Sequence, residues 1–334
     1  MNSEKLNKNL HNTTNHPIET IKKIIHNYFG NDFKKFDDLK PQVSIEDNFD
    51  KLLIPKDHVS RGPSDTYYVD HQTVLRTHTS AHQNELLCQG HRQFLVTGDV
   101  FRKDTIDASH SPVFHQMEGV KICEDGIDVE QDLRNHIEGL IESLFPKCEY
   151  IMREDKFPFT SPSWEVDVLY NGEWLEVLGC GIIHEQIMTN CGLKDKKGWA
   201  FGLGLERLAM ILFKIPDIRY FWTDDQRFHK QFNGNIIEFK EYSKYPPCKK
   251  DISFWISDEF TENDFCEIVR NKGGDLIEDV TLIDEFTNSK TLKKSLCYRI
   301  TYRSNDRVLT NEEINKIQDD VIKNVSINLN VQIR

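Results

Sequence analysis

The stretch Trp199-Ala-Phe-Gly-Leu-Gly-Leu-Glu-Arg-Leu-Ala-Met-Ile-Leu-Phe213 decides how the fold is interpreted. Its pattern predicts a short strand, a glycine turn and a helix. Gly202 and Gly204 carry no Cβ, so the backbone can turn there and a ligand can approach it closely. Arg207 falls in the first helical turn, where free N–H groups and the helix dipole favour an anion. Because a guanidinium holds a phosphate through two parallel hydrogen bonds, the stretch predicts a phosphate site.

Two other interpretations of this stretch stay open. The first is an ordinary strand-to-helix turn with a solvated arginine. The second is a dinucleotide-binding loop, because Gly202-x-Gly204 matches its start and Asp224 lies about twenty residues farther on, where a ribose-binding acid is expected. However, Arg207 stands where that loop has its third glycine, and this argues against an oxidoreductase.

Length, charge and the distribution of apolar residues limit the classes to which this protein can belong. The chain has 334 residues, enough for two or three domains, and a formal net charge of −12 at pH 7. The acidic balance argues against nonspecific binding of nucleic acid by the whole surface, but it does not exclude a local basic groove. No apolar run is long enough to cross a bilayer or to form a signal-peptide core, so we expect a soluble intracellular protein without membrane contact.

Cysteine and histidine spacing gives little support for a metal site. The eight cysteines are scattered without a Cys-x-x-Cys pair, which argues against a zinc ribbon and a disulfide framework. His78 and His82 have the spacing of two ligands on one helix, but the segment between them lacks the glutamate of a zinc protease. A metal role is therefore the weaker interpretation of this pair.

Periodicity predicts the elements of the first 242 residues. Residues 1–15 are rich in Asn, Lys and Thr and are expected to form a disordered tail. Pro41–Arg76 is predicted to form loops and short strands. Asn171-Gly172 favours a tight hairpin turn. The predicted helices are Pro17–Phe29, Thr79–Gln89 and Asp128–Phe145, and the predicted strands are Phe94–Arg102, Val113–Ile122, Glu149–Arg153, Trp164–Tyr170 and Glu173–Leu178.

One strand and one loop carry side chains that do not fit an ordinary core. Strand periodicity puts Phe114, Gln116 and Glu118 on one face, and an aromatic ring, an amide and a carboxylate in a row indicate recognition. Phe157 and Phe159 alternate around a proline, so both fall on one side. They form either an aromatic wall or part of the core.

The pattern changes near Ser243, and residues 243–334 are predicted to form a second domain. Strands, helices and strands follow in the order βαββαβ, which is typical of a ferredoxin-like fold, and such small sheets often bind RNA. This part carries 14 Lys and Arg against 16 Asp and Glu, a net charge of −2, so it is the less acidic part of the chain. Its strands are expected at Asp251–Ile256, Leu276–Phe286, Ser295–Tyr302 and Val325–Ile333, and its helices at Asn263–Lys272 and Thr310–Asn324. Eight cations form either one basic face or an ordinary solvated surface: Lys249, Lys250, Lys290, Lys293, Lys294, Arg299, Arg303 and Arg307.

Seven stretches follow one another along the chain as a recognisable set: Asn48-Phe-Asp-Lys-Leu-Leu-Ile-Pro55, Arg76-Thr-His-Thr-Ser-Ala-His-Gln83, Gly98-Asp-Val-Phe-Arg-Lys-Asp104, Phe114-His-Gln-Met-Glu-Gly119, Phe157-Pro-Phe-Thr160, Trp174-Leu-Glu-Val-Leu-Gly-Cys-Gly181 and Trp199–Phe213. Taken in order, these motifs resemble the phenylalanyl-tRNA synthetases in their monomeric, organellar form, which are class II aminoacyl-tRNA synthetases. The resemblance extends from about His16 to the C-terminus. It implies an α+β fold, with a class II antiparallel sheet flanked by helices in residues 16–242 and a ferredoxin-like anticodon-binding domain in residues 243–334.

The resemblance implies a ligase. Such an enzyme activates L-phenylalanine with ATP to phenylalanyl-adenylate, with Mg²⁺ accompanying the ATP, and transfers the phenylalanyl group to tRNA(Phe). A monomer in the mitochondrial matrix is implied, with a plastid-type organelle as the alternative, although no presequence is evident in this chain. The rival hypothesis is a synthetase-like RNA-binding protein without catalysis. Arg102, Glu118 and Arg207 argue against it, because a binding module has no use for two phosphate clamps.

The resemblance also implies roles for site residues. Arg102 matches the arginine of class II motif 2, which grips the α-phosphate, and Arg207 matches the motif 3 arginine, which holds the outer phosphate and lies against the adenine. Phe114 stacks on the other face of the adenine, and Gln116 and Glu118 meet the substrate amino group. The other implied substrate-binding residues are His78, Ser80, Ala81, His82 and Gln83 at the amino-acid end, Phe157 and Phe159 around the phenyl ring, Glu176 as the Mg²⁺ ligand, and Ser109, His110, Ser111, Met117, Phe201, Gly202 and Gly204 at the borders.

Overall fold

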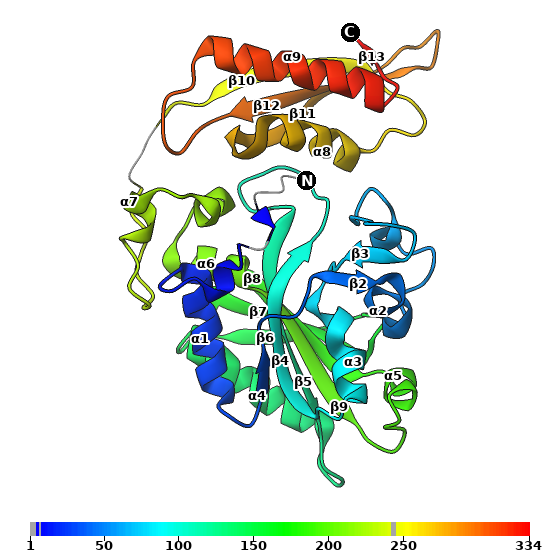
Figure 1. Ribbon diagram of the computed structural model, residues 1–334, viewed down its shortest axis with the longest axis vertical. Helices are drawn as coiled ribbons and strands as arrows, with labels where there is room; N and C mark the ends of the chain where they lie inside the picture. The colour runs from blue at the N-terminus through cyan, green and yellow to red at the C-terminus, as the bar shows by residue number, and fades with distance from the viewer. Residues whose placement is uncertain (1–4, 7, 242–244) are drawn as a thin grey trace.

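The computed structural model describes residues 5–6, 8–241 and 245–334. Two domains lie one above the other in Figure 1. The larger domain is built on a seven-stranded sheet in the order β1-β4-β5-β9-β8-β7-β6, in which only the β1–β4 pair is parallel. Its strands are β1 (Lys34–Phe36), β4 (Gln93–Phe101), β5 (Val113–Ile122), β6 (Tyr150–Asp155), β7 (Thr160–Tyr170), β8 (Glu173–Ile183) and β9 (Gly198–Gly204).

Helices cover both faces of this sheet. One face packs against α1 (Pro17–Phe29), α4 (Val129–Leu144) and α6 (Leu205–Phe213). The other packs against α2 (Ile45–Asn48), α3 (Gln83–Cys88), α5 (Glu185–Asn190) and the two-stranded sheet of β2 (Gln42–Ser44) and β3 (Thr73–Leu75). Among the described residues, the remaining α-helix of this domain is α7 (Gln226–His229), and short 3₁₀ helices include Leu10–Asn12, Asp50–Leu52, Val59–Arg61, Thr79–His82, Ile218–Trp222 and Gly274–Leu276.

The local patterns explain these elements well. In α1, Ile18, Ile21 and Ile25 recur on one side and are fully buried, and Gly30 ends the helix with a φ of 60° that a side chain disfavours. Asn171 and Gly172 both have positive φ, as the tight β7–β8 hairpin requires. The predicted hairpin of β4 and β5 is confirmed, and so are the antiparallel strands that argued against a dinucleotide-binding fold.

Two predictions for this domain need correction. The helix expected at Thr79–Gln89 begins as a 3₁₀ turn, and α-helical geometry starts only at Gln83. The N-terminal tail is not disordered where the structure describes it. Leu10 and His11 are buried, at 7% and 1% exposure, because the 3₁₀ helix Leu10–Asn12 packs against the large sheet. Residues 1–4 and 7 lie outside the described residues.

The smaller domain has the predicted βαββαβ order. Its four strands form an antiparallel sheet in the order β11-β12-β10-β13, with both helices packed into one core. Its elements are β10 (Cys248–Trp255), α8 (Glu262–Gly273), β11 (Ile277–Thr287), β12 (Lys294–Tyr302), α9 (Asn311–Asn328) and β13 (Gln332–Ile333). The extended segment expected at Val325–Ile333 is wrong in its first half, because Val321 and Val325 keep the helical spacing and are buried.

Direct contacts join the two domains through α8 and β11, on the side of the smaller domain that faces the larger one (Figure 1). The Arg270 guanidinium donates to the carbonyl oxygen of Asp104 at 2.6 Å. Ile106, from the loop between β4 and β5, is buried in the core of the smaller domain, and its carbonyl accepts a hydrogen bond from the Val280 amide. The loop that leads from β4 to β5 is therefore held by the smaller domain. Among the described residues, we find no helix with the length and apolar character needed to span a membrane.

Candidate active site

A cavity of about 1090 Å³ opens on the sheet face that also carries α2 and α3. Its walls come from β5, β8 and β9, from the loops around 77–83, 102–111 and 156–160, and from the first turn of α6. Its size suits a ligand larger than a single amino acid, because typical small-molecule pockets hold about 300–1,000 Å³.

Bare backbone forms the floor of the cavity. Strand register places Glu118 of β5 beside Gly202 of β9, and Gly202 beside Gly179 of β8. A Cβ added at Gly202 or Gly204 would meet no atom within 4 Å, so both glycines face open space. Neither has positive φ and both lie within β9, so the predicted glycine turn is wrong. Their function here is to leave room above the sheet.

Two parallel rings stand at one end of this floor. The rings of Phe157 and Phe159 lie 5.9 Å apart at an interplanar angle of 9°. A Cβ at Gly179 would come within 2.9 Å of the Phe157 ring, so this ring rests directly on the glycine. Both phenylalanines line the cavity, and the aromatic-wall interpretation of this loop is therefore favoured over a role as plain core.

Glu118 is buried in the cavity wall without a compensating charge. Its side chain is 2% exposed, and neither carboxylate oxygen has a hydrogen-bond partner among the described residues. Burial raises the pKa of Glu118 to about 8, and the Ser80 hydroxyl opposes this shift. Beside it, Gln116 accepts a hydrogen bond from the Thr79 amide at 3.3 Å. A buried carboxylate of this kind is costly unless a cation reaches it.

His78 lies in the same wall. Both of its ring nitrogens are buried without a hydrogen-bond partner among the described residues. Burial, followed by the nearby Arg102 charge, lowers the pKa of His78 to about 3, so the ring is neutral. A neutral imidazole offers one donor and one acceptor to a polar ligand.

Two arginines from separate elements line the cavity. Arg102 follows β4, donates from Nε to the Thr77 carbonyl oxygen at 2.8 Å and lies 5.2 Å from the centre of the Phe114 ring. Burial lowers the pKa of Arg102 below its ordinary value, although a guanidinium stays charged. Arg207 in the first turn of α6 is 56% exposed, and its guanidinium lies 3.7 Å from the Glu176 carboxylate. Anionic groups of one ligand can therefore meet two cations in the cavity.

The other predicted site residues fall into two groups, those that line the cavity and those whose side chains lie elsewhere. Ser80, Gln83, Ser109, His110 and Ser111 line the cavity, and Asp107 shapes their loop by accepting hydrogen bonds from the Ser109 and His110 amides.

Four predicted residues have side chains elsewhere. Ala81 is buried in the core near α3, and His82 bonds to the Arg76 guanidinium. Met117 points into the core on the opposite sheet face, because it alternates with Gln116 and Glu118. Phe201 borders the cavity, but its ring stacks on Phe29 of α1 at 5.3 Å.

Glu165 was missed by the sequence analysis. It lines the cavity from β7, opposite Gly179. Burial and then the neighbouring Glu176 charge raise the pKa of Glu165 above its ordinary value. The available signal was the alternation of Glu165 and Asp167 with the apolar Trp164, Val166 and Val168.

Known families match both domains. Residues 1–232 match the class II core domain of tRNA synthetases (F), and residues 243–334 match the ferredoxin-fold anticodon-binding domain. The antiparallel sheet, the cavity with its two arginines and the appended ferredoxin-like domain thus define a class II aminoacyl-tRNA synthetase.

Curated relatives identify the family within this class of synthetases. A chloroplastic/mitochondrial phenylalanine–tRNA ligase of Arabidopsis thaliana is 53% identical to this chain, over 99% of the chain and 81% of the relative. Mitochondrial phenylalanine–tRNA ligases of Dictyostelium discoideum and Mus musculus are 46% and 44% identical, over 99% and 95% of the chain and 88% and 81% of the relatives. The chain belongs to the phenylalanine–tRNA ligase family.

Proposed function

We propose that the chain activates L-phenylalanine with ATP to phenylalanyl-adenylate and then transfers the phenylalanyl group to tRNA(Phe). The observation that carries this proposal is the buried Glu118 carboxylate, which has no hydrogen-bond partner in the described part of the chain and lies in one cavity with an aromatic pair and two arginines. A substrate that satisfies all three features has an ammonium group, an aromatic side chain and an adjoining phosphate. Phenylalanine and ATP supply these groups together.

The amino acid lies at the end of the cavity near Phe157 and Phe159. Its ammonium group pairs with Glu118, beside Gln116 and Ser80, and its phenyl ring packs edge-to-face against the two phenylalanine rings. His78 and Gln83 complete the polar wall with buried side-chain atoms that find no hydrogen-bond partner among the residues the structure describes. Such a pocket rejects tyrosine only by lacking room or partners for the hydroxyl, a discrimination of about 2 kcal/mol.

ATP lies over the bare floor at the other end. The adenine is held between Phe114 and the Arg207 guanidinium, and Arg102 neutralises the α-phosphate at which the amino-acid carboxylate attacks in line. Both steps are displacements in which negative charge develops on oxygen. Positioned cations and donors therefore supply the catalysis, and no nucleophilic side chain is needed.

A divalent cation accompanies the ATP, and the residues present fit Mg²⁺. Glu176 and Glu165 both line the cavity, and their mutual repulsion is one cause of the raised pKa of Glu165. Mg²⁺ prefers such hard carboxylate oxygens. We assign Glu176 as its ligand, with Glu165 beside it, and the ion would neutralise charge on the phosphates.

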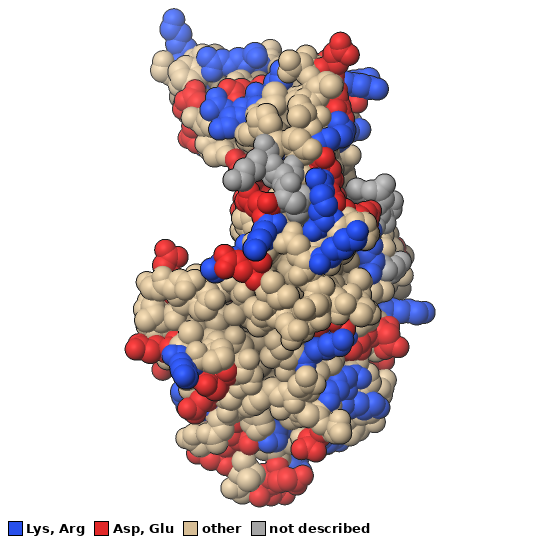
Figure 2. All heavy atoms as spheres, turned by 90° about the vertical axis from the view of Figure 1, so that its left-hand side faces the viewer, with Lys and Arg blue, Asp and Glu red and all other residues tan. Residues whose placement is uncertain are grey.

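The tRNA anticodon is recognised on the open face of the small sheet. Trp255 and Phe286 lie 6.0 Å apart between ring centres, and the Arg334 guanidinium lies within 5.5 Å of both rings. Stacking on such a platform contributes about 1–3 kcal/mol per base. Support from charge is weaker than expected, because Lys294, Arg299, Arg303 and Arg307 each pair with an acidic neighbour. Figure 2 shows basic and acidic side chains interspersed on this part of the molecule.

The proposed place of action is the matrix of an organelle. The relatives from Dictyostelium and mouse are named mitochondrial, and the one from Arabidopsis chloroplastic/mitochondrial. We further propose that the chain acts as a monomer, because one chain carries both the complete cavity and the anticodon-binding domain.

The test is phenylalanine-dependent exchange of labelled pyrophosphate into ATP. Arg207→Ala is the test variant, and Arg227→Ala is its matched control, because that arginine is also about half exposed (49%) and its guanidinium pairs with the Asp225 carboxylate outside the cavity. We expect exchange in the wild type and the control and its collapse in Arg207→Ala, with slower exchange when tyrosine replaces phenylalanine. Absence of exchange in folded wild type would favour the rival hypothesis of a non-catalytic RNA-binding protein.

A further inference from the structure

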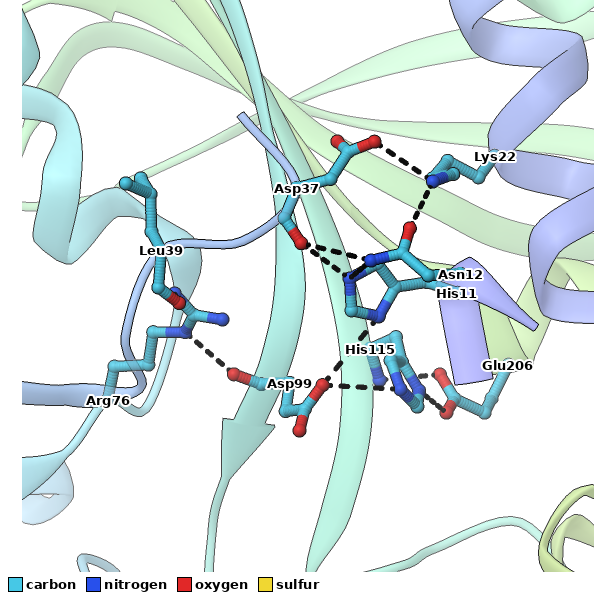
Figure 3. A network of polar contacts seen from close by, with 9 residues as sticks. All are labelled: His11, Asn12, Lys22, Asp37, Leu39, Arg76, Asp99, His115 and Glu206. Atoms are coloured by element: carbon cyan, nitrogen blue, oxygen red, sulfur yellow. Dashed lines mark hydrogen bonds and ion pairs between the residues drawn. The ribbon is translucent and has the colours of Figure 1, made fainter. Parts of the chain in front are cut away.

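Three buried polar atoms converge on the sheet face opposite the cavity (Figure 3). His11 comes from the N-terminal 3₁₀ helix, Asp99 from β4 and His115 from β5, and their exposures are 1%, 3% and 0%. Asp99 Oδ1 lies 3.7 Å from His11 Nδ1 and 3.4 Å from His115 Nε2. None of these three atoms has a hydrogen-bond partner among the residues described.

In each histidine, the ring nitrogen that points away from Asp99 already has a polar partner. His115 Nδ1 lies 2.6 Å from one carboxylate oxygen of Glu206, and the other oxygen accepts the His115 amide at 2.7 Å. His11 Nε2 lies 3.0 Å from the Asp37 carbonyl oxygen and 3.2 Å from the side-chain amide nitrogen of Asn12, which donates to the same carbonyl. In the neutral tautomer whose Nδ1–H donates to Glu206, His115 turns the Nε2 lone pair toward Asp99. In the tautomer whose Nε2–H donates to the Asp37 carbonyl, His11 likewise turns the Nδ1 lone pair toward Asp99. Two lone pairs and a carboxylate oxygen repel one another unless a positive charge lies between them.

We propose that His11, Asp99 and His115 bind a divalent transition-metal ion, with Zn²⁺ as the best match. With zinc–ligand bonds of about 2.0–2.2 Å, ligand atoms of a tetrahedral site lie roughly 3.3–3.5 Å apart, close to the two separations found here. Two imidazoles and one carboxylate are typical zinc ligands, and water completes the coordination. The carbonyl behind His11 and the carboxylate behind His115 are the outer partners that commonly orient metal-binding histidines.

This site is distinct from the proposed Mg²⁺ site. Imidazole nitrogen favours zinc and its neighbours in the first transition row over magnesium, which selects oxygen. The two sites are also on opposite faces of the sheet, since His115 alternates along β5 with the cavity residues Phe114 and Gln116.

The ion would tie three separate parts of the chain together. His11 belongs to the N-terminal segment, the strand ligands belong to the sheet, and Glu206 belongs to α6 directly before the cavity residue Arg207. The site is therefore structural: it clamps the N-terminal segment over the sheet and steadies the start of α6. Because the segment carrying His11 covers the site, loading and release of the ion require this segment to open.

The test is metal binding by the full-length chain after treatment with a chelator. We would titrate ZnCl₂ by calorimetry, determine bound zinc by elemental analysis, and use CoCl₂ as a probe whose visible absorption reports tetrahedral nitrogen and oxygen coordination. We expect one equivalent of Zn²⁺, intense cobalt bands and a higher melting temperature on loading.

Variants distinguish zinc binding at this site from zinc binding by other histidines. His11→Ala should lose more affinity than the roughly 10–100-fold typical of removing an outer partner, and Glu206→Gln should fall within that range. His71→Ala removes an exposed histidine and should bind zinc as the wild type does. If His11→Ala fails to fold, Asp99→Asn keeps the shape of the side chain and should still weaken binding.

Two results would overturn the proposal. One is a folded, chelator-treated wild type that takes up neither Zn²⁺ nor Co²⁺, which would assign the buried positive charge to a proton. The other is unchanged zinc affinity and unchanged cobalt bands in folded His11→Ala or Asp99→Asn, which would place the ion elsewhere.

Discussion

The Tyr67 hydroxyl donates a hydrogen bond to the Glu267 carboxylate at 2.8 Å, across the boundary between the two domains. Burial and the Glu267 charge both raise the pKa of Tyr67, so the phenol keeps its proton and the bond persists at physiological pH. The same carboxylate also pairs with Arg270, which in turn holds the Asp104 carbonyl. The smaller domain is thus bound to the loop that follows the cavity residue Arg102.

Tyr67→Phe should loosen this boundary. A hydrogen bond to a charged group contributes about 1.5–3 kcal/mol, and the variant removes it without creating a large cavity. We expect a larger radius of gyration by small-angle X-ray scattering. Tyr68→Phe is the control, since the Tyr68 hydroxyl donates within its own domain, to the Arg61 carbonyl at 2.7 Å. Equal scattering by both variants would show that the contact does not hold the domains together.

Glu118 should make stability depend on pH. Its pKa of about 8 lies above its ordinary value of 4.5, so the native state binds this proton more tightly than the unfolded chain does. The associated stability is complete below about pH 4.5 and is lost as the pH rises to about 8. Glu118→Gln cannot ionise, so it should be more stable than the wild type above this window, by at least about 1–3 kcal/mol. Urea denaturation at both ends of the window measures the difference.

The same carboxylate should control binding of phenylalanine. Only ionised Glu118 pairs with the substrate ammonium, so phenylalanine affinity should fall as the pH drops below about 8, by up to about tenfold per pH unit. In Glu118→Gln, calorimetry should show weak binding without this dependence. A wild-type affinity that stays constant over this range would exclude the proposed ion pair.

Substitutions at two glycines of the cavity floor should affect the binding of the two substrates differently. Gly179→Ala places a methyl group within 2.9 Å of the Phe157 ring and must displace it, so we expect a several-fold rise in KM for phenylalanine. Gly202→Ala meets no protein atom within 4 Å and projects into the cavity, so it should fold normally and weaken binding of the ligand above it. Pyrophosphate exchange at varied phenylalanine and ATP measures both. Unchanged KM for phenylalanine in folded Gly179→Ala would remove Phe157 from the amino-acid pocket.

Trp255→Ala should weaken tRNA binding without affecting adenylate formation. The loss of one stacked base costs about 1–3 kcal/mol, equivalent to roughly 5–150-fold in KM for tRNA. Trp174→Ala is the control, because Trp174 is an exposed tryptophan (45%) of the catalytic domain. Equal aminoacylation kinetics for Trp255→Ala and Trp174→Ala would place the anticodon on another surface.

Elements with strong local signals could be predicted from the sequence. The apolar stripe and terminal Gly30 define α1, and Asn171-Gly172 defines the β7–β8 hairpin. Alternation along β5 likewise predicted that Phe114, Gln116 and Glu118 share one face, and all three line the cavity.

Features that depend on distant contacts could not be predicted. The N-terminal residues are polar and lack periodicity, and only the sheet that forms more than 80 residues later explains the burial of His11. Met117 was included because it lies within a motif, although strand alternation points it into the core. Glu165 belongs to no motif, and its place in the site follows from strand register across β8.

The alternation along β5 has a genetic consequence. Phe114, Gln116 and Glu118 line the cavity, while His115 between them faces the proposed zinc site. Losing or gaining one codon within this strand would turn every following side chain to the opposite face, so both sites would fail together. This segment can therefore evolve by replacing residues one at a time, whereas a single in-frame insertion or deletion should be eliminated by selection.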